Sequence, residues 1–168
     1  MMNEARLLAV DPSLRGTGFG VLESRGRKVV ALDYGVIRNA PKIRPSACLL
    51  VINERIHDLI TKWQPAAVAI ESVIYVQSYR TAIQLGAARG AAILAAAKHG
   101  IPVFEYAPRR VKQAVVGLGS AQKDQVAFMI RAMLELTETP PSDAADALAI
   151  GLTHLQMANH PAVEREQI

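Results

Sequence analysis

The chain has 168 residues, of which 51% are apolar and 20% charged, with a net charge of +4 and a pI near 9.5. This length suits one domain with a real core, and the composition excludes a disordered chain. The single cysteine, Cys48, excludes an internal disulfide and a cysteine metal cluster, and the most apolar stretch is broken by charges. We therefore expect a cytoplasmic protein without a membrane segment, whose basic balance permits binding to phosphates.

The first third of the chain reads as three strands. Residues 6–11 (RLLAVD) form an apolar run that stops at Asp11, as in a buried central strand. Residues 16–24 and 28–38 follow as two more strands, joined by the turn-like segment SRGR. The short connections predict an antiparallel meander.

The rest of the chain alternates helical and strand patterns. In chain order we expect a helix from Ser46 to just before Pro65, a strand over 66–71, a helix over 81–99, a strand over 102–107, and helices over roughly 120–136 and 143–158. This order predicts an α/β fold, a mixed five-stranded sheet flanked by helices. We place one domain at 1–158 and expect a loosely ordered C-terminal tail at 159–168.

Two groups of glycines interrupt these elements. Gly16, Gly18 and Gly20 weaken the second strand unless something approaches its backbone closely, and both DNA and a β-bulge remain open as the reason. Gly86 and Gly90 lie in a helix, where they allow another backbone to come near. That backbone is either the sheet of the same chain or a partner subunit.

Four acidic residues stand out by their positions. Asp11 and Glu71 each end an apolar strand, and the carboxyl ends of parallel strands are where α/β sheets place their sites. Asp143 and Asp146 are three residues apart, so they share one helix face with Cβ atoms roughly 5–6 Å apart. Asp143 alone is also explained by the helix dipole, and Asp11 alone by a turn before Pro12.

Four converging carboxylates would repel one another unless cations neutralise them. Hard oxygen ligands without histidine or cysteine suit Mg²⁺ or Mn²⁺. Two such ions support in-line phosphoryl transfer, in which one activates water and the other stabilises the leaving oxygen. The pattern therefore indicates a nuclease.

Four sequence blocks follow one another along the chain: AVDPSLRGTGFGV, AIESV, VFEYAPRRVKQAVVGLGSAQKDQV and DAADALAIGLTH. With these blocks in this order, the chain resembles the RuvC family of bacterial Holliday-junction resolvases over nearly its whole length. It implies an RNase H-like fold and a crossover junction endodeoxyribonuclease that acts in recombination and DNA repair. It also implies a homodimer with Mg²⁺, two ions per subunit with Mn²⁺ as a substitute, that cuts two like strands of a four-way DNA junction symmetrically. The RuvA–RuvB branch-migration complex is the implied partner.

Carried over by position, the resemblance makes Asp11, Glu71, Asp143 and Asp146 the catalytic metal ligands. It assigns Lys112 and Lys123 to junction binding and cleavage, and we expect Arg80, Arg109 and Arg110 to contact DNA with them. Relatives often carry a base-stacking phenylalanine after the catalytic glutamate, where this chain has Ile74 with Tyr75 beside it. Tyr75 is a candidate replacement, because stacking on a base tolerates either ring.

Three other functions remain open on the sequence. The strand, acid and Gly-Thr-Gly pattern also occurs in ATP-binding proteins of the actin and sugar-kinase type, although these need two such lobes. A junction-binding clamp without cleavage is the second alternative. An RNase H-like nuclease of the ribosomal-RNA-processing type is the third.

Overall fold

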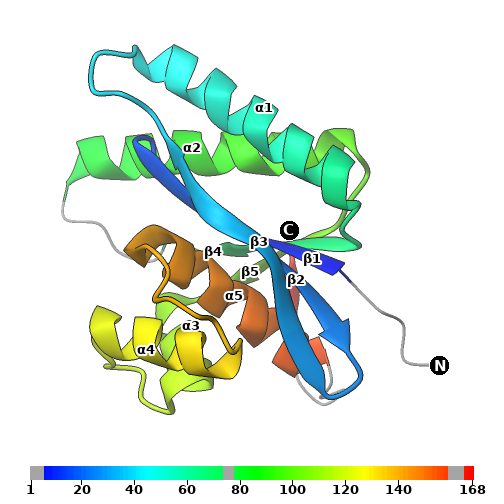
Figure 1. The fold of residues 1–168 in the computed structure, drawn as a ribbon. Coiled ribbons are helices and arrows are strands. Elements are labelled where there is room, and N and C mark those ends of the chain that lie inside the picture. Colours follow the sequence, from blue (N-terminus) through cyan, green and yellow to red (C-terminus); the bar gives the residue numbers. More distant parts are fainter. Residues whose placement is uncertain (1–5, 74–77, 159–164) are drawn as a thin grey trace.

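The computed structural model describes residues 6–73, 78–158 and 165–168, and its sheet forms the centre of the molecule (Figure 1). The strands are β1 (Arg6–Asp11), β2 (Gly16–Arg25), β3 (Lys28–Arg38), β4 (Ala67–Glu71), β5 (Val103–Tyr106) and β6 (Glu166–Gln167). The helices are α1 (Pro45–Trp63), α2 (Tyr79–Lys98), α3 (Pro108–Val116), α4 (Lys123–Met133) and α5 (Ser142–Ala158). Among the described residues, no helix combines the length and the apolar character needed to span a bilayer.

The sheet has the order β3-β2-β1-β4-β5-β6. β1, β2 and β3 form the expected antiparallel meander, whereas β4 and β5 run parallel to β1. Helices α1 and α2 cover one face, and α3, α4 and α5 cover the other (Figure 1). The predicted mixed α/β architecture is confirmed.

Two elements differ from the prediction. The sheet has six strands rather than five, because Glu166 and Gln167 pair with β5 and cover its otherwise open edge. Two residues are too few to show a strand period, so the sequence predicted a loose tail there; residues 159–164 lie outside the described part. Helix α3 was also missed, because three basic residues leave only Val111 and Val115 as its buried positions.

Alternation along the central strand divides the core into two halves. Leu8 and Val10 pack toward α1 and α2, whereas Leu7 and Ala9 pack toward α5. Because successive side chains point to opposite faces of a strand, Asp11 belongs to the α5 side. The strand period therefore decides which helices face the first candidate carboxylate.

The glycines of β2 allow helix α5 to lie directly on the sheet. A Cβ atom on Gly18 would stand 1.9 Å from the backbone oxygen of Asp143, and one on Gly20 would stand 2.6 Å from Cδ2 of Leu148. Both open explanations for these glycines are wrong: the close neighbour is α5 rather than DNA, and the bulge lies between Val21 and Leu22.

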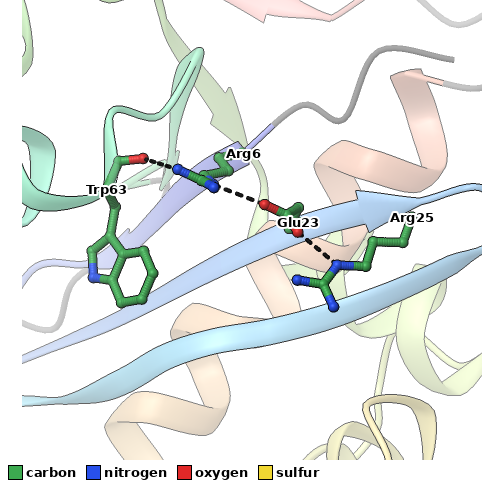
Figure 2. Close-up of polar contacts among 4 residues, drawn as sticks. All are labelled: Arg6, Glu23, Arg25 and Trp63. Atoms are coloured by element: carbon green, nitrogen blue, oxygen red, sulfur yellow. Dashed lines mark hydrogen bonds and ion pairs between the residues drawn. The ribbon is translucent and has the colours of Figure 1, made fainter. Parts of the chain in front are cut away.

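A buried carboxylate ties the sheet together at the end opposite Asp11 (Figure 2). Glu23 accepts hydrogen bonds from Nε of Arg6 at 2.7 Å and from Nε of Arg25 at 2.6 Å. Arg6 also donates through Nη1 to the backbone oxygen of Trp63, at the end of α1. These two arginines lower the pKa of Glu23, so its charge is stabilised in the folded protein.

Candidate active site

Asp11 and Glu71 lie side by side at the carboxyl edge of the sheet. β1 and β4 are parallel neighbours in which Val10 pairs with Ile70, so each strand's next residue is the acid. Both acids line a pocket of about 240 Å³. The sequence expectation that these two strand ends meet is therefore met in the structure.

Helix α5 adds Asp146 to this pocket. The helix is positioned by its glycine contacts with β2, and its first turn is closed by a hydrogen bond from the Ala145 amide to the Pro141 carbonyl. Asp143 differs from expectation, because it is not among the residues that line the pocket. Its Oδ2 atom lies toward β2, 3.1 Å from where a Cβ atom on Gly16 would be.

The carboxylates of the pocket influence one another. Burial, followed by the negative charge of Glu71, raises the pKa of Asp11 to about 8, and Asp146 and Asp143 contribute to the rise. Burial and the charge of Asp146 likewise raise the pKa of Glu71 to about 7. The pocket therefore concentrates negative charge that favours either protons or cations.

Two lysines face these acids. The Nζ atom of Lys123 lies 3.3 Å from Oδ2 of Asp146, and the charge of Asp146 raises the pKa of Lys123. Lys112 also lines the pocket, and its charge opposes the rise in the pKa of Glu71. The second turn of α3 and the first residue of α4 thus bring Lys112 and Lys123 to the acids.

The donor set of this pocket fits a hard divalent cation in its chemistry. Three carboxylates from three different elements surround one space, and burial, together with the charges of neighbouring acids, raises their pKa values. Within the described ranges, however, no three acidic, histidine or cysteine side chains are close enough to hold one ion. In this structure Lys123 supplies a counter-charge to Asp146.

The remaining predicted residues are dispersed. Ile74 and Tyr75 lie outside the described residues. Arg80 is exposed in the first turn of α2, and Arg109 is exposed on α3 with its side chain against Gly119. Arg110 lines a different and larger cleft on the other flank of α3.

Sequence reasoning missed the wall that α3 contributes to the pocket. Pro108 and Val111 line it beside Lys112, and Val126 and Ala149 complete its apolar floor. Proline at the first helical position and valines four residues apart were the available signals for α3. These signals are weak next to the charged residues Arg109 and Arg110, so the sequence did not predict α3.

His154 is a satisfied core residue, as its position off the Asp146 stripe suggested. Its Nδ1 atom lies 2.8 Å from the hydroxyl of Tyr106, and its ring packs on Phe104. Burial lowers the pKa of His154 to about 4, so it is neutral at physiological pH. It helps hold α5 against β5 and is not a ligand candidate.

Comparison with known proteins identifies relatives of one kind. Residues 7–154 match the family described as crossover junction endodeoxyribonuclease RuvC. A protein of that name from Akkermansia muciniphila is 54% identical, and the alignment covers 92% of each chain. Another from Cronobacter sakazakii is 46% identical over 92% of this chain and 88% of the relative.

A solved structure gives the same result for the fold. RuvC of Thermus thermophilus, determined in complex with a Holliday junction substrate, superposes with a TM-score of 0.89 at 35% identity. The superposition covers 96% of this chain and 99% of that one. The RNase H-like fold expected from the sequence is thereby confirmed.

Proposed function

Since the chain belongs to the RuvC family of crossover junction endodeoxyribonucleases, we propose that it resolves Holliday junctions by hydrolysing one phosphodiester bond in each of two like strands. The observation that carries this proposal is the pocket in which Asp11, Glu71 and Asp146 meet Lys112 and Lys123. Three acids supply ligands for cations, and two lysines supply positive charge for a phosphate, so one site serves both needs of phosphodiester hydrolysis.

Family membership implies dependence on a divalent cation, and we propose Mg²⁺ as that cation, two ions per subunit, with Mn²⁺ as a substitute. Asp11, Glu71 and Asp146 would hold these ions. Asp143, which lies toward β2, would be a further ligand. When bound, such ions lower the pKa of water and stabilise the leaving oxygen.

The chain's own residues perform the remaining tasks. The raised pKa values of Asp11 and Glu71 favour protons at these carboxylates near neutral pH, and bound cations would replace those protons. Lys123 neutralises Asp146 in this structure, and with Lys112 it offers a positive charge to the scissile phosphate. Val111, Val126 and Ala149 line the same pocket with apolar surface, which strengthens electrostatic interactions there.

Junction binding should come mainly from phosphate contacts and from the branched shape. Arg80, Arg109 and Arg110 are exposed, and the latter two lie on the helix that carries Lys112. Contacts of this kind release counterions, so affinity should fall steeply with salt. Whether Ile74 or Tyr75 stacks on a base is best tested by comparing Ile74→Ala with Tyr75→Ala.

We propose a homodimer formed through α2. Among the described residues, a Cβ atom on Gly86 or Gly90 would meet no other atom within 4 Å, so these glycines do not serve an approach to the chain's own sheet. Ile83 and Leu94 lie on the same helical stripe and are 72% and 53% exposed. An apolar stripe with small residues at its centre suits a second copy of the helix, and two-fold symmetry suits a junction with two like strands.

Family resemblance also leads us to propose the RuvA–RuvB complex as the partner and the cytoplasm as the place of action, in recombination and repair. The family match over residues 7–154 favours a nuclease over the nucleotide-binding and RNA-processing alternatives. The clamp alternative predicts binding without cutting.

One experiment separates these possibilities. The purified protein is incubated with a synthetic four-way junction, a linear duplex of matched sequence and a fork, each with Mg²⁺ or with EDTA, and the ends are mapped. Paired, symmetric, ligatable nicks in the junction alone, and only with Mg²⁺, are the expected result. Binding without nicks would support the clamp, and preferential RNA cutting would support the RNA-processing relatives.

A further inference from the structure

A second cleft lies beside the candidate active site, on the other flank of α3. Its volume is about 870 Å³, and it is lined by Ser72, Tyr106, Ala107, Arg110 and Arg165 among others. We propose that this cleft binds a backbone phosphate of the DNA strand that passes through the carboxylate pocket, with Arg110 and Arg165 as its ligands. This subsite rests on the proposed function, because the strand must first reach the pocket.

The two sites are adjacent in the fold. Glu71 lines the carboxylate pocket and the next residue, Ser72, lines the cleft. Pro108 and Lys112 of α3 face the pocket, whereas Arg110 of the same helix faces the cleft. A DNA strand that is bound at Glu71 therefore needs only to pass the end of β4 to enter the cleft.

The C-terminal segment builds the outer wall of the cleft. β6 pairs with β5, and the amide of Ile168 donates to the carbonyl of Val103 at 3.0 Å. This pairing brings Cζ of Arg165 to 5.1 Å from the centroid of the Phe104 ring, a cation–π contact. Arg165 is thus supported by the sheet although its side chain is exposed.

The guanidinium groups of Arg110 and Arg165 both influence the hydroxyl of Tyr106. Burial raises the pKa of Tyr106 to about 12, and the positive charges of Arg165 and Arg110 oppose that rise. Arginine pairs bind phosphate through forked N–H donors, and the hydroxyl of Ser72 offers a further donor. Ala107, the N-cap residue of α3, lines the cleft, so the positive end of that helix lies beside it.

The acidic residues of the cleft do not cancel this charge. Glu105 forms an ion pair with Arg89 of α2. Glu166, which pairs with Glu105 across β5 and β6, also lines the cleft. Arg110 and Arg165 thus face one further acid in the described part of the cleft, and the balance there stays positive.

The test is the salt dependence of junction binding, measured by anisotropy with a labelled junction in EDTA. Each phosphate contact contributes about 0.9 to the slope of log affinity against log salt. Arg165→Ala should lower the magnitude of that slope by about 0.9. Its loss of junction affinity relative to wild type should therefore shrink by about 3.5-fold between 50 and 200 mM salt. Because both arginines hold the same phosphate, the Arg110→Ala/Arg165→Ala double variant should lose little more slope than Arg165→Ala alone, and Arg165→Lys should retain most of the slope.

Two controls make the result specific. Arg27→Ala removes an exposed arginine from the β2–β3 turn, at the opposite end of the sheet from Asp11, and should leave the slope unchanged. A neutral methylphosphonate, moved one position at a time through the phosphates next to the cut, should at one position weaken wild-type binding and abolish the effect of Arg165→Ala.

If the wild-type protein cuts junctions but Arg165→Ala leaves the slope unchanged, the subsite alone is overturned. An equal loss for Arg27→Ala would overturn it too, because the effect would then follow net charge. A wild-type protein that neither binds nor cuts junctions would overturn the proposed function as well.

Discussion

Replacing Gly18 with alanine should damage the active site without touching any of its charged groups. The new Cβ atom would stand 1.9 Å from the carbonyl oxygen of Asp143 and 2.5 Å from its carbonyl carbon. Both are backbone atoms of α5, so no side-chain rotation relieves the overlap. To reach an ordinary contact near 3.4 Å, the start of α5 must withdraw from β2 by about 1.5 Å.

That withdrawal has two measurable consequences. Overpacking of this kind costs about 1–3 kcal/mol of folding free energy. Because Asp143 and Asp146 move with α5, a displacement above 1 Å should reduce Mg²⁺-dependent cutting by about 10²-fold or more. Junction binding should survive, since the basic residues on α3 are not displaced.

Gly20→Ala is the matched control in the same strand. Its Cβ atom would meet Cδ2 of Leu148 at 2.6 Å, which is the end of a side chain about one and a half turns from Asp143. It should cost stability to a similar degree while leaving most of the cutting rate intact. Single-turnover cleavage at saturating protein and thermal unfolding separate the two effects. Wild-type cutting by Gly18→Ala, or an equal loss for both variants, would refute the reasoning.

The remaining predictions concern single charges. Asp146→Asn should abolish Mg²⁺-dependent cutting while junction binding persists, and normal cutting would remove Asp146 from the site. Lys112→Ala should reduce turnover far more than thermal stability, and equal loss of both would make it structural. Glu23→Gln should cost about 1.5–3 kcal/mol, whereas Glu135→Gln, which breaks an exposed pair with Lys28, should cost less than about 1 kcal/mol. Because the pKa of Glu23 is lowered, its contribution should be present at neutral pH and disappear as pH falls below its unfolded value; a constant difference between Glu23→Gln and wild type down to acid pH would contradict this. The raised pKa values of Asp11 and Glu71, about 8 and 7, have the opposite sign, so metal-free protein should lose stability as pH rises from the unfolded pKa values of these groups to about 8. Added Mg²⁺ should therefore raise the melting temperature more at pH 8 than at pH 6, and a shift independent of pH would contradict the exchange of protons for cations.

Much of the fold and of the carboxylate set follows from local patterns. Two apolar runs that end in Asp11 and Glu71 identify buried strands and their acidic ends, because a continuous apolar run is typical of a strand buried on both faces. The three-residue spacing of Asp143 and Asp146 follows from the helical period. Their assignment as metal ligands remains a prediction.

Tertiary structure alone decided how these parts come together. GTGFG is compatible with DNA, a bulge or a helix as its close neighbour, and only the packing of α5 on β2 distinguishes them. Asp143 and Asp146 share one helix face, yet only the packing of α5 on the sheet shows that the Asp143 carboxylate lies beside Gly16 of β2 while Asp146 lines the pocket. Arg165 and Gln167 carry no local signal at all, because a two-residue strand is stabilised by the edge it covers and not by its own sequence. Residue types and their spacing thus determined the chemistry available to this protein, while contacts between segments distant in the chain decided which of those residues face the same space.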